Sequence, residues 1–457
     1  MVVVVLLVVV AVVAVLAGVH WYVWRRLVRD TTARGGAARR TGTVATWVLP
    51  LLSVGALVSG RAGAPFWLQR VLAWPGYLWL AVLLYLTLAL VVGEGVRLLL
   101  LRRARERPST TAVTGAKSPA RPLPETVGQS PWTTGPTPAA PARGESGHAA
   151  LVTTPMAEAS ANRTLAHPAP EAVAADPPAA HGALSRRMFV SRVVGSGAAA
   201  VALGTVGYGA YGVLRGPRVK RVTVPLARLP RAAHGFRIAV VSDIHLGPIL
   251  GRAHTRRIVD TINATSPDLV AVVGDLVDGT VADLGPAAEP LAQLRARHGS
   301  FFVTGNHEYF SGAEEWVDHV RELGLRPLRN ERVEIAGFDL AGVNDLAGES
   351  EGDGPDFAKA LGDRDPARAS VLLAHQPVVI HDAVEHGVDL QLSGHTHGGQ
   401  LWPGNYLAAL ANPTVAGLER YGDTQLYVTR GAGAWGPPVR VGAASDITVV
   451  QLASRQA

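Results

Sequence analysis

The hydrophobic pattern of the N-terminal part differs from that of the rest of the chain. Residues 2–24 contain no Asp, Glu, Lys or Arg and consist mainly of Val, Leu and Ala. At a rise of 1.5 Å per residue, such a stretch is long enough to cross the hydrocarbon core of a membrane. Residues 41–60 and 71–93 are also uncharged and long enough, and neither shows the polar stripe of a helix in a soluble domain. We therefore predict three transmembrane helices within residues 1–104.

The basic residues that flank these stretches predict their orientation. A cleaved signal peptide is the alternative for the first stretch, but it would carry basic residues before its apolar core, whereas the arginines of residues 25–40 come after it. Cytoplasmic loops are enriched in Lys and Arg. Residues 25–40 and 97–107 are therefore expected in the cytoplasm, and residues 61–70 are expected to form a short outer loop.

A long linker and a fourth apolar stretch come next. Residues 105–184 are rich in Pro, Ala, Thr, Gly and Ser and hold few large apolar side chains, so we predict a disordered linker on the cytoplasmic side. Residues 185–214 begin with the pair Arg186 and Arg187 and continue as an apolar run of small residues. They resemble a twin-arginine export signal, and an ordinary transmembrane helix with flanking arginines is an equal alternative. Both place the chain beyond residue 214 outside the cytoplasm, although basic residues just after the stretch weaken this orientation.

From residue 223 to residue 455 the pattern changes to short β-branched runs that alternate with helical patterns. This alternation predicts an α/β domain built of layers. The expected strands are residues 236–242, 269–274, 300–304, 370–374 and 389–393, and the expected helices are residues 254–264, 287–297 and 313–323. Each strand is followed at once by polar residues, and open α/β sheets place their sites outside the carboxyl ends of their strands.

The amino-acid composition limits which partners and which reactive side chains the protein can use. The net charge is +7, but the excess Arg lies mainly beside the apolar segments, which favours membrane topology over nucleic-acid binding, and no nucleic-acid partner is expected. The chain has no Cys, so disulfides, thiolate metal sites and Cys nucleophiles are excluded. Any metal ligands must be His, Asp, Glu or Asn.

The predicted strand ends carry side chains that offer an oxygen atom or an imidazole nitrogen. In chain order they are Asp243 and His245, Asp275 and Asp278, Asn306, His307 and Glu308, His375, and His395 and His397. Residues i and i+2 of an extended chain point to one side, so the D-x-H and H-x-H pairs can converge. Oxygen donors combined with imidazole suit Mn, Fe or Zn. Each motif alone has a structural explanation, but their joint order at strand ends predicts a metal site.

This order of motifs, D-x-H, G-D-x-x-D, G-N-H-[DE], H and G-H-x-H, resembles the calcineurin-like metallophosphoesterase family over residues 237–452. The sequences around residues 241–247 and 394–400 look most like its membrane-associated branch, which includes the YkuE-type and YaeI-type phosphoesterases. The resemblance implies a four-layer α-β-β-α sandwich, here preceded by the transmembrane helical region.

The resemblance also implies roles for these residues. Asp243, His245 and His397 would bind the first metal ion, and Asn306, His375 and His395 the second. Asp275 would bridge both ions, and His307 would be the catalytic residue, a proton donor or electrostatic partner that binds no metal. The implied cofactors are two divalent ions of Mn, Fe or Zn.

Other polar and aromatic residues near these motifs have weaker interpretations. Asp278 and Glu308 match motif positions without a ligand role, so we expect them to support the ligands. Trp402, Tyr406 and Trp435 could line an apolar substrate groove or pack in the fold, and the sequence favours packing.

The leading functional hypothesis is a multi-pass membrane enzyme whose catalytic domain lies outside the cytoplasm. It would hydrolyse phosphate monoesters, diesters or pyrophosphates, with a phosphate-containing small molecule or a lipid-linked phosphate as substrate. One alternative is a nucleotide-sugar pyrophosphatase. Another is a non-enzymatic membrane sensor with a phosphoesterase fold, whose signature would be a lost ligand, and no ligand is lost in this sequence.

Overall fold

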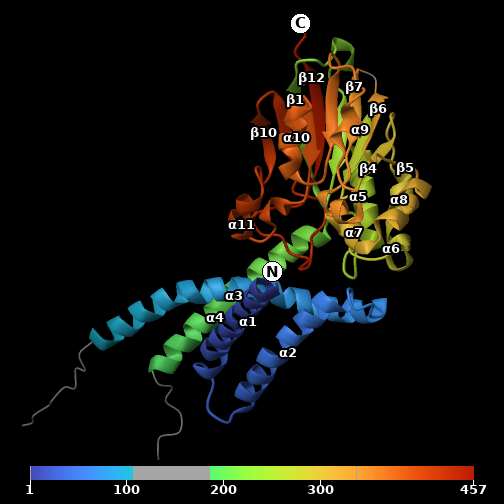
Figure 1. Cartoon of the computed structure of the whole chain (residues 1–457). Coiled ribbons are helices and arrows are strands. Elements are labelled where there is room, and N and C mark those ends of the chain that lie inside the picture. Colours follow the sequence, from blue (N-terminus) through green and yellow to red (C-terminus); the bar gives the residue numbers. More distant parts are fainter. Residues whose placement is uncertain (1, 107–185, 336, 457) are drawn as a thin grey trace, which may run out of the picture. The chain divides into compact units, whose positions relative to one another are not determined.

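The computed structural model describes residues 2–106, 186–335 and 337–456 (Figure 1). Most of the predicted linker, residues 107–184, lies outside the described residues.

Four helices of the described part are long and apolar enough to cross a membrane. They are α1 (Val2–Trp24), α2 (Ala37–Ser59), α3 (Phe66–Glu106) and α4 (Arg186–Leu214). A helix thus occurs at each of the four predicted stretches, and α2 and α3 begin a few residues earlier than expected. Arg186 and Arg187, the pair that resembles an export signal, are the first two residues of α4.

Helix α4 packs through a line of small residues. Its buried positions include Gly195, Ala198, Ala202, Val206 and Gly209, which recur every three or four residues and so lie on one face. Small side chains let neighbouring helices approach closely, which is how membrane helices associate without a hydrophobic driving force. This face shares a buried cluster with α1 and α3.

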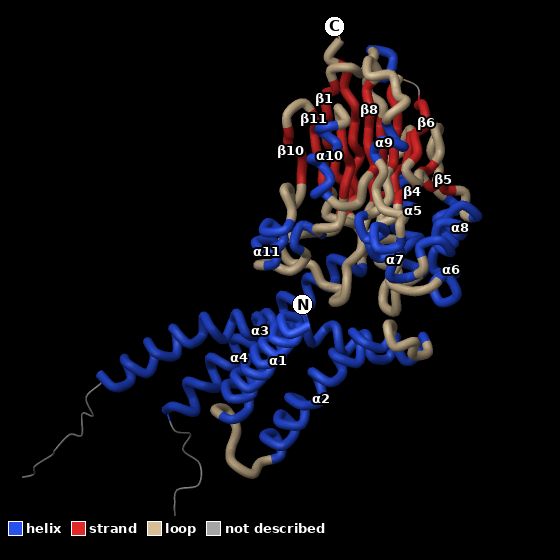
Figure 2. Tube along the Cα trace, viewed as in Figure 1, coloured by secondary structure: helices blue, strands red, loops and turns tan. Residues whose placement is uncertain are grey.

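The chain after α4 forms two six-stranded sheets (Figure 2). The first has the order β1-β12-β2-β3-β4-β5, and the second has the order β10-β11-β9-β8-β7-β6. The first sheet comprises β1 (Arg218–Leu226), β2 (Arg237–Val241), β3 (Leu269–Val273), β4 (Ser300–Val303), β5 (Leu325–Pro327) and β12 (Asp446–Ser454). The second comprises β6 (Glu331–Ile335), β7 (Phe338–Gly342), β8 (Ala369–Leu373), β9 (Leu390–Ser393), β10 (Gly417–Tyr421) and β11 (Thr424–Val428).

The two sheets pack face to face, and helices cover their outer faces. One buried cluster joins side chains from both sheets, such as Val240 and Val303 from the first and Leu340 and Leu373 from the second. A second cluster joins the first sheet to α5 (Arg252–Ala264), α6 (Val281–Ala288) and α8 (Ala313–Glu322). A third joins the second sheet to α9 (Phe357–Leu361) and α10 (Ile380–Glu385). The four-layer α-β-β-α sandwich is therefore confirmed.

Parallel pairing brings the predicted strand ends to one edge. β2, β3 and β4 are parallel neighbours in the first sheet, and β8 and β9 are parallel neighbours in the second. Their carboxyl ends therefore meet at the same edge of each sheet. The predicted helix at residues 287–297 is wrong, because α6 ends at Ala288 and a 3₁₀ turn occupies Glu289–Gln293. Pro290 lies in this turn, and a proline has no N–H to continue an α-helix.

The domain is joined closely to α4. β1 begins at Arg218, four residues after α4 ends at Leu214, and pairs with β12 along its whole length. Residues 439–441, between β11 and β12, also contact α4: the carbonyl of Gly209 accepts a hydrogen bond of 3.3 Å from the backbone N–H of Arg440.

We expect Gly209→Ala to weaken this contact, because the added Cβ would lie 2.7 Å from Val439 and 2.8 Å from the carbonyl oxygen of Arg440. Overpacking of this kind costs about 1–3 kcal/mol. Gly212→Ala, on the same helix, is the matched control because no atom lies within 4 Å of the added Cβ. The melting temperature of the detergent-solubilised chain should fall for the first variant only. Equal melting temperatures would contradict the close contact.

Candidate metal centre

The side chains singled out in the sequence come together where the strands end. They lie in the loops directly after β2, β3, β4, β8 and β9. Asn306, His307 and Glu308 begin the short helix α7 (Asn306–Ser311), His397 begins a 3₁₀ turn (His397–Gly399), and the others lie in irregular backbone. The centre is thus built from both sheets, as the joint order of the motifs predicted.

The backbone of the centre is unusual at several of its polar residues. Eight described residues other than glycine have a positive φ, and five of them are candidate ligands: Asp243, His245, Asp275, His395 and His397. Such a conformation costs about 1–3 kcal/mol per residue and persists only where the surroundings enforce it. The surrounding fold therefore holds these residues in a strained backbone conformation, in which their possible ligand atoms lie close to one another.

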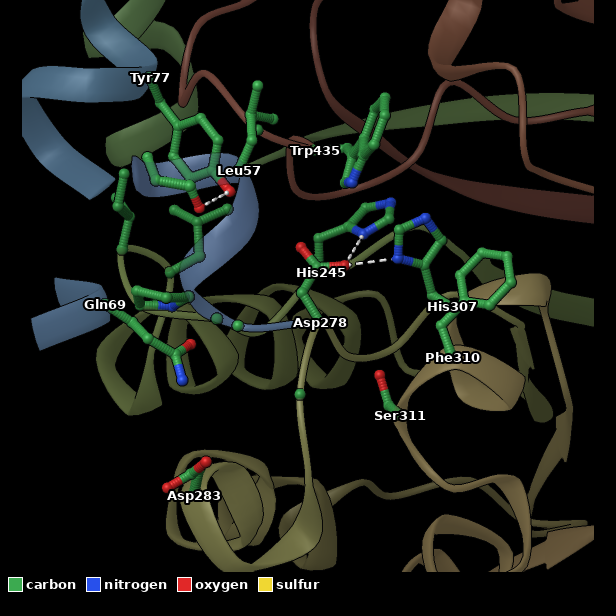
Figure 3. Close-up of a pocket in the computed structure, with 18 of the residues that line it drawn as sticks. Leu57, Gln69, Tyr77, His245, Asp278, Asp283, His307, Phe310, Ser311 and Trp435 are labelled. Carbon is green, nitrogen blue, oxygen red and sulfur yellow. Dashed lines mark hydrogen bonds and ion pairs between the residues drawn. The ribbon is translucent and has the colours of Figure 1, made fainter. Parts of the chain in front are cut away.

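Asp278 holds two imidazoles in place (Figure 3). Its Oδ1 accepts a hydrogen bond of 2.8 Å from Nδ1 of His245 and lies 2.7 Å from Nδ1 of His307. Burial alone would raise the pKa of Asp278, but the two imidazoles lower it below its usual range. Asp278 therefore contacts Nδ1 of both rings, and these three residues also form a group of possible metal ligands.

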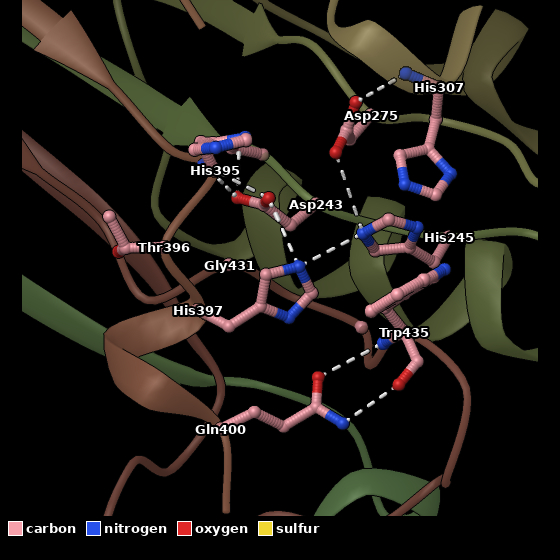
Figure 4. Close-up of polar contacts among 12 residues, drawn as sticks. Asp243, His245, Asp275, His307, His395, Thr396, His397, Gln400, Gly431 and Trp435 are labelled. Atoms are coloured by element: carbon pink, nitrogen blue, oxygen red, sulfur yellow. Dashed lines mark hydrogen bonds and ion pairs between the residues drawn. The ribbon is translucent and has the colours of Figure 1, made fainter. Parts of the chain in front are cut away.

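Asp243, His245 and His397 form a first group of donors (Figure 4). Nε2 of His245 lies 3.0 Å from Nε2 of His397, which lies 3.3 Å from Oδ1 of Asp243. The backbone N–H of His395 donates to the Asp243 carboxylate at 3.0 Å and thereby ties the loop after β9 to the loop after β2. Gly394 permits this approach, since a Cβ at this position would overlap the Asp243 carboxylate.

Asp275, His375 and His395 form a second group. Oδ2 of Asp275 lies 3.1 Å from Nε2 of His375 and 3.7 Å from Nε2 of His245 in the first group. Asp275 therefore lies between the two groups. Oδ1 of Asn306 lies 3.1 Å from Nδ1 of His395 and adds a neutral oxygen to the second group.

The hydrogen bonds of the His375 ring indicate whether these residues can hold a cation. Its Nδ1 lies 2.9 Å from the carbonyl of Val273, which can only accept a hydrogen bond, so Nδ1 carries the proton. In the neutral ring, Nε2 then presents a lone pair, and this buried atom has no hydrogen-bond partner among the described residues. Burial would lower the pKa of His375, but the Asp275 carboxylate raises it well above its ordinary value, so either a proton or a metal ion lies between Nε2 and this carboxylate. The residues present therefore fit a metal ion.

Burial and neighbouring charges shift the pKa values of the carboxylates and imidazoles in the centre. Burial would raise the pKa of Asp243 and Asp275, but the surrounding imidazoles lower both well below the usual range. Burial would lower the pKa of His245, but the nearby carboxylates raise it to about 9. Carboxylates that remain ionised in a buried site attract cations.

Glu308 fixes the loops that carry the second group. Its Oε2 accepts hydrogen bonds from the backbone N–H groups of Gly305 and Asp275, and its Oε1 accepts one from Leu276. Burial, followed by the charge of Asp275, raises the pKa of Glu308 to about 7. The side chain therefore supports the loops after β3 and β4.

Arg440 is a residue of the centre that sequence reasoning missed. Its side chain is buried and donates to the carbonyls of Gly433 and Ala443 and, at 3.0 Å, to the carbonyl of His397. Its Nη2 lies 3.2 Å from Nδ1 of the His397 ring. Burial lowers the pKa of Arg440 to about 10. The residue lies outside every motif, so no local pattern could have identified it.

Comparisons with known proteins agree with this geometry. A sequence model of the family described as "Calcineurin-like phosphoesterase" matches residues 236–399. The chain is 40% identical to "Transmembrane protein with metallophosphoesterase domain" of Danio rerio, over 54% of this chain and 59% of that protein. It is 37% identical to an "Uncharacterized metallophosphoesterase" of Helicobacter pylori strain J99, over 59% of this chain and 72% of that protein. It is 29% identical to YkuE of Bacillus subtilis, over 59% of this chain and 98% of that protein.

We expect Arg440→Met to weaken metal binding, because His397 would lose the group that fixes its backbone and ring. Supporting residues of this kind typically contribute 10–100-fold to metal affinity. Affinity for Mn²⁺ is measured by competition with a chelator on the full chain in detergent. Arg430→Met is the matched control, since Arg430 forms no hydrogen bond or ion pair with a described residue. Equal Mn²⁺ affinities for the two variants would show that Arg440 does not position His397.

Proposed function

Since the chain belongs to the calcineurin-like metallophosphoesterase family, we propose that it is a membrane-anchored phosphoesterase that depends on two divalent metal ions. It hydrolyses phosphate monoesters, diesters or pyrophosphates, including lipid-linked ones. The observation that carries the proposal is the position of the Asp275 carboxylate between two groups of inward-facing donors. Two cations close together need a shared anionic ligand, because they otherwise repel each other.

The two groups define the proposed ligands. Asp243, His245 and His397 would hold the first ion, and Asn306, His375 and His395 would hold the second. Asp275 lies between the two groups and would serve both. Carboxylate, amide and imidazole donors without a thiolate suit Mn, Fe or Zn.

Hydrolysis at this centre requires proton transfer by the protein. When bound, the two ions lower the pKa of a water molecule and stabilise the charge that develops on the phosphoryl oxygens. The water oxygen attacks phosphorus, the bond from phosphorus to the leaving oxygen breaks, and the proton of the water returns to solvent. Nε2 of His307 protonates the leaving oxygen, because Asp278 holds Nδ1 of the same ring.

The membrane arrangement is inferred from the helices and from the likeness to proteins named for a transmembrane part. The chain is a multi-pass membrane protein, and we propose spans within residues 2–24, 41–60, 71–93 and 185–214. A linker (105–184) joins the third and fourth spans, and the phosphoesterase domain (223–455) comes after the fourth.

We further propose that the domain lies outside the cytoplasm. The residues between α2 and α3 line a pocket together with residues of the domain, which supports placing both on one side of the membrane. The arginines after α1, those near the end of α3 and the pair at the start of α4 then lie together on the opposite side. The positive-inside rule makes that side the cytoplasm, so Arg186 and Arg187 are cytoplasmic, as an export signal requires.

Metal content and activity of two variants test the proposal. The full chain in detergent is stripped of metal, reloaded with Mn²⁺, Fe²⁺ or Zn²⁺, and assayed with p-nitrophenyl phosphate and bis-p-nitrophenyl phosphate. We expect about two ions per chain for the unmodified protein and fewer for Asp275→Asn, because the shared ligand is lost. His307→Ala should keep its metal but lose about 10²–10⁴-fold in kcat with an alkyl phosphate, whose leaving oxygen must be protonated, and less with the p-nitrophenyl esters, whose leaving phenolate needs little protonation.

His381→Ala, on an exposed position of α10, is the control and should match the unmodified protein. A chain that binds metal but cleaves neither substrate would refute the hydrolase and favour the sensor.

A further inference from the structure

The centre opens into a pocket whose opposite wall comes from the membrane helices (Figure 3). His245, Asp278 and His307 line it from the domain. Residues 56–77, here called the α2–α3 hairpin, comprise the end of α2, the loop and the start of α3, and they line it with Leu57 and Tyr77 among others. The pocket beside the candidate catalytic histidine is therefore incomplete without the transmembrane part of the chain.

Hydrogen bonds and close helix packing hold the α2–α3 hairpin in a defined shape beside the pocket. The hydroxyl of Tyr77 donates to the carbonyl of Ala56 at 3.1 Å, and the hydroxyl of Ser53 donates to the carbonyl of Gly76 at 2.8 Å. Gly76 lets the two helices approach closely, since a Cβ there would lie 2.7 Å from Ala56. These contacts fix the distance between α2 and α3 and therefore the shape of the wall.

Arg61 provides the only guanidinium group among the residues that line this pocket. It forms no ion pair with any residue in the described ranges. Asp278, the carboxylate of the centre that also lines the pocket, already contacts two imidazoles. A guanidinium matches the oxygens of a phosphate group with two parallel hydrogen bonds. Arg61 is therefore available to an anionic substrate.

The mouth of the pocket is apolar on both sides. Leu57 of the hairpin is 40% exposed, and Phe310 and Trp435 of the domain are 67% and 51% exposed. Trp435 therefore lines the pocket, which is the interpretation that the sequence disfavoured. Its ring lies 5.8 Å from that of His307, so the apolar surface reaches the candidate catalytic residue.

The size of the pocket limits what enters it. Its volume is about 200 Å³, below the roughly 300–1,000 Å³ of pockets that enclose a whole drug-sized ligand. A phosphate headgroup can enter, while a longer organic group must remain at the apolar mouth. An alkyl chain there is removed from water, which favours binding of an ester that carries such a chain.

We propose that the α2–α3 hairpin is the substrate-binding wall of the active site and selects phosphoesters that carry an apolar chain and reside in the membrane. Arg61 binds the anionic oxygens of the headgroup, and Leu57 binds the apolar chain together with Phe310 and Trp435. This inference rests on the proposed phosphoesterase function and names the substrate class of the same site.

Two matched phosphodiesters test the apolar part of the wall. p-Nitrophenyl methyl phosphate and p-nitrophenyl dodecyl phosphate lose the same leaving group, and they differ only in the alkyl chain. The full chain, loaded with Mn²⁺ in detergent, should show at least tenfold higher kcat/KM with the dodecyl ester. Leu57→Gln should lower this preference at least fivefold, because kcat/KM falls more for the dodecyl ester than for the methyl ester.

Val58→Gln is the matched control for Leu57→Gln. Val58 is the next residue of α2, is 52% exposed and does not line the pocket. Its variant should keep the preference of the unmodified protein. This control separates recognition by the wall from the tendency of the dodecyl ester to concentrate in detergent micelles, which every variant shares.

A second pair of variants tests the headgroup contact. Arg61→Ala should raise KM for both esters about tenfold with little change in kcat, because both esters carry the same anionic oxygens. Arg61→Lys should restore part of the loss through its charge. Arg70→Ala, at an exposed arginine of the same hairpin that does not line the pocket, should have no effect.

The outcomes separate this inference from the function on which it rests. If the unmodified protein cleaves neither these esters nor p-nitrophenyl phosphate, the phosphoesterase function fails and the inference with it. If it cleaves p-nitrophenyl phosphate but neither diester, the inference alone fails. If it cleaves both esters but shows no preference, or keeps its preference in Leu57→Gln, the hairpin does not select the chain. Equal loss on both esters in Leu57→Gln, or equal KM values for Arg61→Ala and Arg70→Ala, would also overturn the inference. Melting temperature and bound Mn²⁺ of each variant verify that the fold and the metal centre are intact.

Discussion

Imidazole and carboxylate groups are buried close together across the loops after β2, β3, β8 and β9, and the rest of the structure depends on holding them there. Nε2 of His245 lies 3.0 Å from Nε2 of His397, and Nε2 of His375 lies 3.1 Å from the Asp275 carboxylate. Atoms at these distances need a proton or a metal ion between them and a rigid backbone that keeps them in place. The buried core between the two sheets makes the strands rigid. Glu308, which accepts hydrogen bonds from backbone N–H groups of the loops, and Arg440, which donates to backbone carbonyls, hold the loops in place.

The sequence predicted this centre because parallel strands bring successive strand ends to one edge. Each motif directly follows a short β-branched run, so its position in the fold could be inferred from local pattern alone. Arg440 could not be predicted in this way, since its partners are backbone carbonyls and the His397 ring, which are distant in sequence or carry no residue-specific signal. The error at residues 287–297 has a local cause, because an apolar periodicity favoured a helix that Pro290 interrupts.

The positions of the membrane helices along the chain could be predicted from the sequence, but the contacts that these helices make could not. Length and lack of charge were sufficient to identify four helices. A helix that is apolar all round has no preferred face, however, so its sequence does not reveal what it contacts. The packing of Gly209 against the segment that carries Arg440, and the position of Leu57 and Arg61 beside the centre, emerge only from the assembled chain.

The short connection between α4 and β1 has a consequence for how the domain can reach its surroundings. Three residues separate Leu214 from Arg218, and they span roughly 10 Å at most. One of them is Pro217, whose ring fixes φ and stiffens the connection further. A domain attached in this way stays at a constant height above the bilayer surface. For a membrane-resident substrate of the kind proposed above, the depth of its phosphate group would therefore determine whether the domain reaches it, and its surface density rather than its bulk concentration would govern encounter.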